Sequence, residues 1–337
     1  MIRRTLLTLA LLLVGSGLAH AEFTLQGRTV TLYVAGGVGG GVDAYARSFA
    51  PHLAHYLPGE PTIVVSNMPG AGGIQALQYQ YNVAAKDGTS IGTTNAGPVA
   101  EPVMGDKNVK YDLLKFGWFG SLAKGDTVCG VWESSPIKTI ADARAHEMTI
   151  SSTGALSAPT RTALLLNALL GTKIKPIPGY DGGTSLLAVE RGEVDGTCVT
   201  LDSLRATRPQ WFSDKKLRLL VQCSLDKDPD FPDVPRAYDL ISDESGRRML
   251  EFFLTPYEVQ NPFYLAPGFK PEMLAAYRTA FDKAVADPAF RTEARARRLK
   301  IESRNGAQVE AVIKKMLNTP EDVQRKTRAV TDPKTAK

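Results

Sequence analysis

Two glycine-rich loops carry the residues of this sequence that are best suited to hold a ligand. The first, residues 36–41, reads Gly-Gly-Val-Gly-Gly-Gly, and the second, residues 70–73, reads Gly-Ala-Gly-Gly. Each loop directly follows a short β-like run, and helical spacing resumes after each one. Backbone N–H groups and the positive end of a helix therefore converge at both loops, with no bulky side chain in the way. This arrangement favours an anion such as a carboxylate or a phosphate.

The residues that we expect to contact a ligand come from these loops and from two later turns of the same kind. The later turns are residues 152–157, after a predicted strand, and residues 180–183, before a predicted helix. Each has an alternative interpretation: the glycines suit tight turns, Ser157 suits a helix N-cap, and Tyr180 suits packing at the rim of a cleft. The predicted ligand-binding residues are Val38, Gly39, Gly40, Gly41, Asn67, Gly70, Ala71, Gly72, Thr153, Gly154, Ser157, Tyr180, Gly182 and Gly183.

Asp43 follows the first loop, and we expect it to cap the next helix rather than to contact a ligand. Arg47 stands one helical turn later and can pair with it. An aspartate facing a bound carboxylate would repel it. The sequence therefore predicts a structural role for Asp43 as an N-cap.

Two classes of enzyme are weaker alternatives. Residues 39–44 satisfy the relaxed dinucleotide-binding pattern Gly-x-Gly-x-x-Ala after a strand, which would suggest an oxidoreductase. The second predicted strand, however, ends in Ser66 and Asn67 and offers no acidic residue to a ribose. A serine hydrolase is not favoured, because the Ser-x-x-Lys match at residues 135–138 has a proline inside its expected helical turn and the chain has no Lys-Thr-Gly partner for it. We expect a protein without catalytic residues and without a cofactor.

A metal-binding receptor is a further alternative. His52 and His55 lie three residues apart on a predicted helix, a spacing that could chelate a metal. The sequence offers no evident third ligand, so an ordinary amphipathic surface helix is the favoured interpretation, and we expect no metal site.

The pattern of strands and helices that must position these loops predicts an α/β protein with mostly parallel sheets. Strand-like and helical runs alternate in the first half of the chain, and the second half repeats the order of strand, loop and helix. Pro51 lies inside a helical pattern and should kink or split it, whereas Pro159 and Gly171 suit the start and the end of a helix. The predicted strands are 30–34, 63–66, 90–94, 128–132, 148–151, 194–199 and 217–222, with an extended segment at 261–267, and the clearest predicted helices are 43–56, 73–83, 140–146 and 307–317.

The N-terminus has the features of an export signal. Arg3 and Arg4 precede an apolar run at residues 5–14, and residues 19–21 read Ala-His-Ala, an A-x-A cleavage sequence. We therefore expect cleavage after Ala21 and a periplasmic protein. A retained N-terminal anchor is the alternative, although no later run approaches the roughly 20 apolar residues of a membrane-spanning helix.

Charge, length and cysteine content further limit the kind of protein that this sequence can encode. The formal net charge of +5 is small for 337 residues, and the interspersed basic residues argue against a nucleic-acid partner. The length suggests two domains. Cys129, Cys198 and Cys223 permit at most one internal disulfide, and we expect all three to be buried free thiols.

A set of motifs occurs in a fixed order along most of the chain. The motifs are Asp43-Ala44-Tyr45-Ala46-Arg47, the run from Val64 to Gly73, the run from Ala84 to Thr89, Ser152-Thr153-Gly154, Tyr180-Asp181-Gly182-Gly183, Gly192-Glu193-Val194-Asp195 and the run from Pro229 to Pro235. Together they resemble the Bug family, the extracytoplasmic solute-binding proteins of tripartite tricarboxylate transporters. The chain departs from that family at Val38 and Val42, where Pro and Thr are frequent, and at Arg236, where Thr is common.

The resemblance implies a two-lobed periplasmic binding protein, type II-like, with a mostly parallel sheet in each lobe and the ligand in the cleft. Such a receptor holds a small carboxylate through backbone amides of both lobes and bridging waters, and delivers it to membrane permease subunits. We expect a monomer. The predicted boundaries are a signal peptide at 1–21, lobe 1 at 22–122 and 256–322, lobe 2 at 123–255, and a disordered tail at 323–337.

Overall fold

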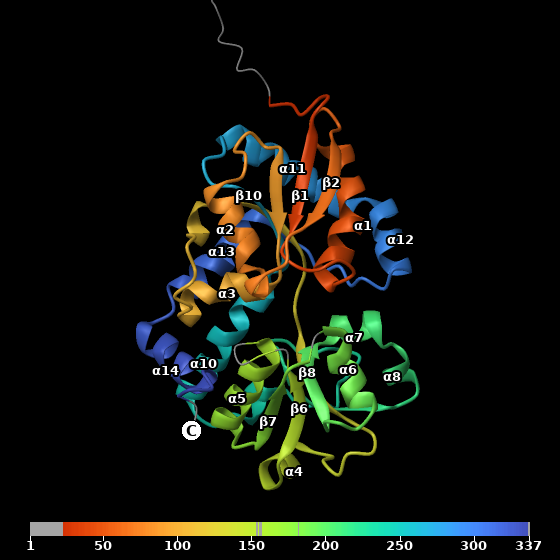
Figure 1. Ribbon diagram of the computed structural model, residues 1–337, viewed down its shortest axis with the longest axis vertical. Helices are drawn as coiled ribbons and strands as arrows, with labels where there is room; N and C mark the ends of the chain where they lie inside the picture. Colours follow the sequence, from red (N-terminus) through yellow and green to blue (C-terminus); the bar gives the residue numbers. More distant parts are fainter. Residues whose placement is uncertain (1–22, 153, 155–156, 181, 336–337) are drawn as a thin grey trace, which may run out of the picture.

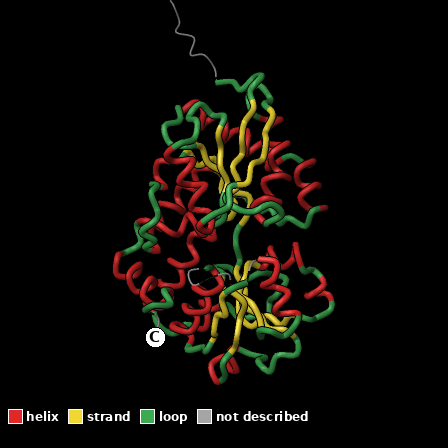
Figure 2. The backbone as a smooth tube through the Cα atoms, viewed as in Figure 1, coloured by secondary structure: helices red, strands yellow, loops and turns green. Residues whose placement is uncertain are grey.

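The computed structural model describes residues 23–152, 154, 157–180 and 182–335, so the predicted cleavage site after Ala21 lies outside the described residues. The described chain forms two lobes stacked along the long axis of the molecule, each built around its own sheet (Figure 1). Helices flank both sheets (Figure 2), which confirms the predicted α/β class. Within this part of the chain, no helix has both the length and the apolar character that a membrane crossing requires.

Lobe 1 contains a six-stranded sheet in the order β11-β4-β10-β3-β1-β2. Parallel and antiparallel pairs are mixed in this sheet and in that of lobe 2, which corrects the prediction of mostly parallel sheets. β1 is parallel to both β2 and β3, whereas β10 is antiparallel to β3 and β4. The three parallel strands therefore end at the same edge of the sheet, where ligands of α/β proteins commonly bind. The strands are β1 (Thr29–Val34), β2 (Thr62–Asn67), β3 (Ser90–Thr93), β4 (Gly117–Ala123), β10 (Gln260–Leu265) and β11 (Arg304–Asn305).

Helices cover both faces of the lobe 1 sheet. Side chains of β4 and β10 alternate between the faces, so Phe263 packs with one layer of helices and Tyr264 with the other. The Phe263 layer contains α1 (Gly41–Tyr56), α11 (Pro271–Ala286) and α12 (Pro288–Ala296). The Tyr264 layer contains α2 (Ile74–Asn82), α3 (Ala96–Met104) and α13 (Gly306–Leu317), with the short 3-10 helices η1 (Ala71–Gly73) and η2 (Leu113–Lys115) nearby.

Lobe 2 contains a five-stranded sheet in the order β7-β6-β8-β5-β9. β6 is parallel to β7 and β8, and β5 is antiparallel to β8 and β9. One face packs against α5, and the other packs against α6, α7 and α8. The elements are β5 (Thr127–Trp132), α4 (Ile140–Ala145), β6 (Met148–Ser152), α5 (Ala158–Leu170), β7 (Ile174–Pro178), α6 (Gly182–Glu190), β8 (Gly196–Thr200), α7 (Leu201–Thr207), α8 (Gln210–Ser213), β9 (Leu217–Cys223) and α9 (Ala237–Leu240).

The chain passes between the lobes more than once. It enters lobe 2 between β4 and β5, and it returns through α10 (Glu244–Leu254) and the 3-10 helix η3 (Thr255–Glu258) into β10. One hydrophobic cluster continues from the α2 and α3 side of lobe 1 through α10 into the α5 side of lobe 2. The lobes therefore share part of their core. The exact residues at which one lobe becomes the other stay a prediction.

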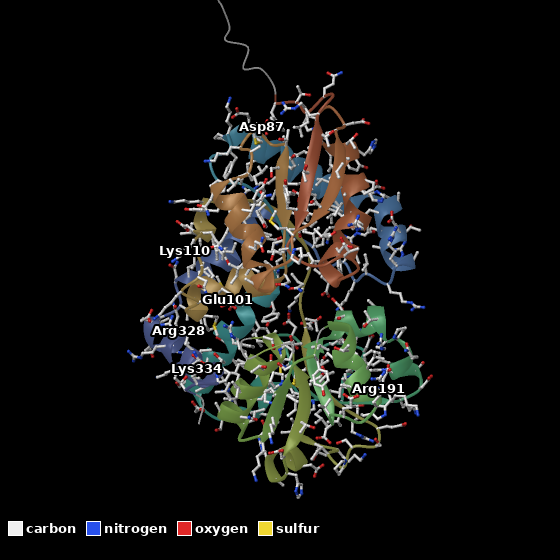
Figure 3. All side chains as sticks on the ribbon, in the orientation of Figure 1. Asp87, Glu101, Lys110, Arg191, Arg328 and Lys334 are labelled. Carbon is white, nitrogen blue, oxygen red and sulfur yellow. A yellow bond between two sulfur atoms is a disulfide. The ribbon has the colours of Figure 1, made fainter. Side chains whose placement is uncertain are left out.

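The C-terminal segment corrects the prediction of a disordered tail at 323–337. Glu321–Thr331 form helix α14, which packs against α5 and α10. Val323, Thr327 and Thr331 are buried at a spacing of one helical turn. Two of these three residues are threonines whose hydroxyls donate to the carbonyl one turn earlier, so the buried face looked polar in the sequence. Arg328, which Figure 3 labels, also donates to the Val103 carbonyl at 2.9 Å and ties α14 to α3.

The cysteines correct a second prediction. Cys129 on β5 lies directly opposite Cys198 on β8, and the two form a disulfide. Only Cys223 is a free thiol, and it is buried. Burial alone raises the pKa of the Cys223 thiol to about 12, so it stays protonated and unreactive. The pairing follows from the register of β5 against β8, which the spacing of cysteines in a sequence does not reveal.

Two further local predictions differ from the structure. Helix α1 runs unbroken from Gly41 to Tyr56 through Pro51, because its buried residues Phe49 and Leu53 hold it on the sheet despite the missing N–H. Strands β4 and β7 were not predicted. β7 contains Pro176 and Pro178 and lies at the edge of its sheet, where a missing N–H is tolerated.

Candidate functional site

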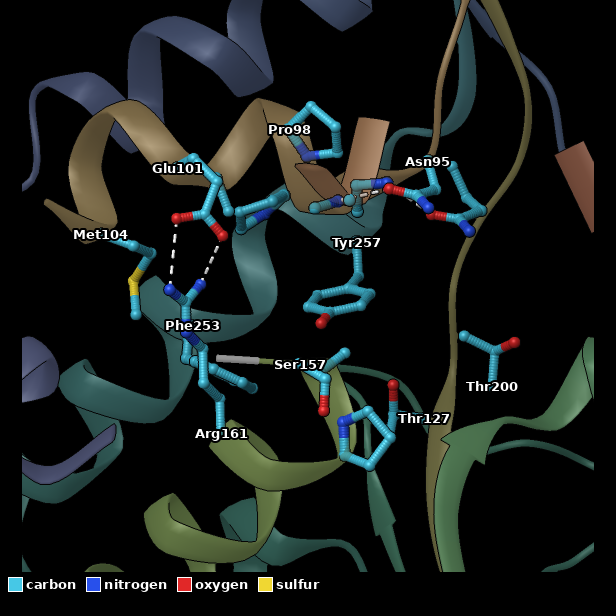
Figure 4. Close-up of a pocket in the computed structure, with 18 of the residues that line it drawn as sticks. Asn95, Pro98, Glu101, Met104, Thr127, Ser157, Arg161, Thr200, Phe253 and Tyr257 are labelled. Atoms are coloured by element: carbon cyan, nitrogen blue, oxygen red, sulfur yellow. Dashed lines mark hydrogen bonds and ion pairs between the residues drawn. The ribbon is translucent and has the colours of Figure 1, made fainter. Parts of the chain in front are cut away.

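A cavity of about 430 Å³ lies between the lobes and receives residues from both of them. In lobe 1 its lining comes from η1, from the turn between β3 and α3, and from α3 itself. In lobe 2 it comes from the start of α5 and from the turn between β8 and α7, and residues of α10 and η3 complete it (Figure 4). The loops that follow parallel strands thus meet lobe 2 at this cavity, as expected for an α/β binding site.

The second glycine loop forms the lobe 1 rim of the cavity through Ala71 and Gly72. The backbone is left-handed at both residues, with φ of 45° and 65°, and positive φ continues at Gly70 and Gly73. Gly70 favours glycine, because its φ of 136° is a conformation that L side chains rarely adopt. Among the described residues, the N–H groups of Ala71 and Gly72 have no hydrogen-bond partner, so both remain able to donate to a ligand.

The N-terminus of α5 forms the lobe 2 counterpart, with Ser157, Ala158 and Pro159 at the cavity. Ser157 holds the N-cap position, but its side chain makes no capping hydrogen bond. Its hydroxyl lies 2.9 Å from Ser152 Oγ and 3.3 Å from Thr160 Oγ1 instead. The positive end of a 13-residue helix therefore faces the cavity without a side-chain cap, a favourable environment for an anion.

An ion pair between the lobes closes one end of the cavity. Arg161 of α5 donates to both carboxylate oxygens of Glu101 of α3, at 2.6 and 3.2 Å. The two side chains are only 10% and 13% exposed. Figure 4 shows the pair beside Met104 and Phe253, on the opposite side of Tyr257 from Thr127 and Thr200.

Neutral polar groups line the opposite part of the cavity. The hydroxyls of Thr127, Thr200, Ser203 and Tyr257 reach it, and within the described chain none of them has a hydrogen-bond partner. Burial, as the largest cause, raises the pKa of Tyr257 to about 12, so its phenol stays a neutral donor at physiological pH. These hydroxyls can therefore hydrogen-bond an uncharged part of a ligand.

The first glycine loop does not line this cavity. Val38 is 78% exposed, and Gly39, Gly40 and Gly41 are exposed beside it. The loop is held from behind by Asp43, which accepts the N–H of Gly39 at 2.8 Å. Glycine content alone therefore did not identify the loop that lines the cavity.

Asp43 has a structural role, but it is not the N-cap of α1. Gly40 takes the N-cap position without a side-chain hydrogen bond, and Asp43 lies buried in the first turn. Its carboxylate accepts from Arg47 Nε at 2.9 Å, as predicted, and from Asn67 Nδ2 at 2.9 Å. Burial acts to raise the pKa of Asp43, but these hydrogen bonds and that of Gly39 outweigh it and hold the pKa below its ordinary value.

Of the predicted ligand-binding residues, Ala71, Gly72 and Ser157 line the cavity. The Asn67 amide is occupied by Gly36, Asp43 and Arg47. Gly154 hydrogen-bonds within the loop before α5, and the Tyr180 hydroxyl lies 3.4 Å from Glu193. Gly182 and Gly183 begin α6, and Gly70 shapes its loop without lining the cavity. Thr153 lies outside the described residues.

The polar or charged cavity residues that were not predicted from the sequence include Asn95, Glu101, Arg161 and Tyr257. Asn95 carried a usable signal, because it stands between the third strand and a Pro-containing helix start and caps α3 through Gly97 N–H at 2.9 Å. The others lie within helices, where nothing in the sequence distinguishes them from surface residues.

The predicted histidine pair does not converge on one point. His52 Nε2 lies 3.0 Å from Glu293 of α12, whereas His55 is exposed beside Glu60. Within the described ranges, no group of three or more His, Cys, Asp and Glu side chains could hold a metal ion.

A second hollow between the lobes, of about 310 Å³, has a charged lining. Lys300 of lobe 1 lies 3.7 Å from Asp228 of lobe 2 and 3.1 Å from Glu302. Asp202 of α7 lies beside this cluster, and its burial raises its pKa to about 6 even though Lys300 and Arg205 act to lower it. The lining balances four basic against four acidic residues: Lys124, Lys227, Lys300 and Arg304 against Asp126, Asp226, Asp228 and Glu302. This hollow has no excess of positive charge for an anion.

The sequence matches the family model described as "Tripartite tricarboxylate transporter family receptor" over residues 46–327. Among curated proteins, a UPF0065 protein of Bordetella bronchiseptica is 27% identical over 237 residues, which are 69% of this chain and 69% of that protein.

Solved structures show the same fold. The periplasmic binding protein BugD superposes with a TM-score of 0.68 at 22% identity, covering 89% of this chain and 98% of BugD. MatC of Rhodopseudomonas palustris, solved with bound malate, superposes with a TM-score of 0.65 at 21% identity, covering 88% of this chain and 98% of MatC. The two-lobed binding-protein architecture expected from the sequence is therefore confirmed.

Proposed function

Because the chain belongs to the tripartite tricarboxylate transporter receptor family, we propose that it is an extracytoplasmic receptor for a small carboxylate. It captures the molecule between its lobes and delivers it to the membrane permease of a tripartite tricarboxylate-type transporter. The malate in MatC is a carboxylate of this kind and supports the ligand class. The proposal places the protein in the periplasm, as a monomer, with the signal peptide removed after Ala21.

One observation carries the ligand assignment. Two groups of backbone donors, one from each lobe, line the same cavity: the left-handed turn at Ala71 and Gly72, and the N-terminus of α5 at Ala158, since the N–H of Ser157 already donates to the Gly154 carbonyl at 3.2 Å. Backbone N–H groups and a helix N-terminus favour an anion without a cationic side chain. A carboxylate bound between them would touch both lobes at once.

Bridging of the lobes supplies the mechanism of the receptor. A ligand that contacts both lobes binds the closed arrangement more tightly than the open one. The difference between the two binding free energies is the free energy by which the ligand favours closure. The permease would then recognise the liganded protein by the relative position of its lobes, a hinge-type closure.

The lining residues favour binding over catalysis. Of the described residues at the cavity, none is a histidine or lysine, and the hydroxyl of Ser157 faces only other hydroxyls. A nucleophilic serine would need an adjacent base. We therefore propose a transport receptor rather than an enzyme.

The proposal is tested by thermal melting of residues 22–337 against mono-, di- and tricarboxylates, amino acids, sugars, nucleotides and divalent metals. A ligand present at about 100 times its Kd adds about 2.7 kcal/mol to the free energy of unfolding, which shifts the melting midpoint measurably. Shifts confined to carboxylates are the expected result. Shifts with nucleotides or metals alone would overturn the proposal.

A matched pair of variants then locates the site. Gly72→Val adds a branched side chain at φ of 65° on the cavity rim, and we expect it to weaken carboxylate binding by about tenfold or more. Gly40→Val places the same side chain in the exposed first loop and is expected to change the Kd by less than about threefold. Calorimetric titration of both folded variants measures the two effects. An equal loss in the Gly40 variant would instead assign the first loop to the ligand.

A further inference from the structure

The cavity between the lobes has no free charge on its side chains. Among its described lining residues only Glu101 and Arg161 carry a formal charge, and they are bonded to each other (Figure 4). The positive charge that reaches a ligand therefore comes from the backbone donors and the α5 N-terminus, which suffice for one carboxylate.

The Glu101–Arg161 pair is difficult to open toward a ligand. Its bidentate geometry satisfies both carboxylate oxygens of Glu101, and both side chains are nearly buried. A second ligand carboxylate at this end would have to displace Glu101 from Arg161. Glu101 would then remain as a buried, unpaired charge close to the ligand's own negative charge.

The remaining walls offer no substitute for Arg161. Met104 and Phe253 are apolar neighbours of the pair, and Thr127, Thr200 and Tyr257 on the other side are neutral. Hydroxyl donors can satisfy an alcohol, an amide or a carbonyl, but they compensate a buried carboxylate poorly compared with a cation.

We propose that this receptor selects carboxylates with one negative charge and an uncharged body, and that the Glu101–Arg161 pair excludes dicarboxylates. This inference rests on the proposed function and adds the charge class of the substrate. The guanidinium of Arg161 cannot pair with a ligand carboxylate, because it is already paired with Glu101.

The test compares ligands that differ only in a second carboxylate. Calorimetric titration of the full chain without its first 21 residues uses three matched pairs: butyrate and succinate, hexanoate and adipate, and benzoate and terephthalate. In each pair that binds, the monocarboxylate is expected to bind at least about tenfold more tightly than the dicarboxylate. The compound 6-hydroxyhexanoate, which keeps one charge and adds a hydroxyl, is expected to bind at least as tightly as hexanoate.

Glu101→Gln supplies the decisive variant, because it keeps the shape of the side chain and frees the charge of Arg161. Dicarboxylate binding is expected to improve by at least about tenfold more than monocarboxylate binding, because only a dicarboxylate has a second carboxylate for the freed guanidinium. The double variant Glu101→Gln/Arg161→Gln is the matched control: it removes both charges, and the gain for dicarboxylates is expected to disappear. Circular dichroism and melting without ligand establish that both variants are folded.

The outcomes separate this inference from the proposed function. If wild-type protein binds dicarboxylates as tightly as their monocarboxylate partners, or if Glu101→Gln leaves the ratio unchanged, the inference is overturned and the receptor function stands. If no member of any pair binds and other carboxylates also fail in the melting panel, the proposed function fails first and the inference with it.

Discussion

Lobe 1 and lobe 2 share a layered α/β plan but hold their interiors together by different means. In lobe 1 the ring of Phe49 lies 5.0 to 5.4 Å from the rings of Phe263, Phe281 and Phe290. In lobe 2 the central strands β5 and β8 are joined by the Cys129–Cys198 disulfide.

This difference has a chemical consequence. Packing of aromatic rings does not depend on the redox conditions around the protein, whereas a disulfide persists only in an oxidising compartment. The stability of lobe 2 is thus linked to the proposed periplasmic location, and that of lobe 1 is not. The comparison can be tested at each lobe separately and at the contact between them.

The largest effect is expected in lobe 1, from Phe281→Ala. The ring packs closely over Gly120, where a Cβ would lie 2.2 Å from it, so truncation leaves a cavity that the sheet cannot fill. We expect the free energy of unfolding to fall by about 3–5 kcal/mol in urea denaturation. The control is Leu114→Ala at a side chain 56% exposed, with an expected change below about 0.5 kcal/mol. A similar small change at Phe281 would mean that the aromatic cluster does not hold lobe 1.

A smaller loss is expected in lobe 2 when Cys129 and Cys198 are both replaced by alanine. The disulfide closes a loop of 69 residues, and its removal should lower the free energy of unfolding by about 2–4 kcal/mol. Hydrogen exchange should accelerate in β5 and β8 and stay unchanged in β1 and β10. A thiol reductant should destabilise wild-type protein but not the double variant. Indifference of the wild-type protein to the reductant would remove the contrast between the lobes.

The smallest effect concerns the contact between the lobes, at Asp202. Its pKa is raised by burial from 3.8 to about 6, so between these values the folded protein holds more protons than the unfolded one. The free energy of unfolding contributed by this group therefore falls as pH rises from about 4 to 6, by about 1–3 kcal/mol. Asp202→Asn should abolish this fall, which is measured as the difference in the free energy of unfolding by urea between pH 4.5 and 7.5.

The pH experiment on Asp202 has a control in a carboxylate that lies far from the contact between the lobes. The exposed Glu272 of α11 belongs to lobe 1 alone, and Glu272→Gln should leave the difference between pH 4.5 and 7.5 unchanged. The groups that face position 202 are the same in the wild-type protein and in both variants: Lys300, Arg205, Asp126, Glu302 and Tyr45. Identical slopes for wild type and Asp202→Asn would show that Asp202 is not desolvated between the lobes.

Much of the fold could be predicted from the sequence, because local patterns report local structure. Buried strands such as β1 and β3, and the start and end of α5 at Pro159 and Gly171, are encoded within a few residues. Helix α14 was missed because its buried face contains Thr327 and Thr331, whose polarity is satisfied inside the helix itself.

The candidate site was predicted less completely, since it depends on contacts between distant residues. Both glycine loops look alike in the sequence, but only the second has the left-handed turn at the cavity, and Asp43 draws the first into its own network. The pairing of Glu101 with Arg161 joins helices of different lobes. No local pattern encodes such a pair, so its consequence for ligand charge became visible only with the fold.

The order of the cysteines along the chain bears on how the protein is made. During synthesis or export from the N-terminus, Cys129 and Cys198 emerge before Cys223. Consecutive pairing in order of emergence therefore yields the native disulfide while the third thiol is still absent, and later folding buries that thiol. A complete, unfolded chain has three ways to form one disulfide, and two of them are wrong. If the chain enters an oxidising compartment N-terminus first, as the proposed export implies, its order of emergence favours the native bond, whereas oxidative refolding of the full-length chain offers all three pairings at once.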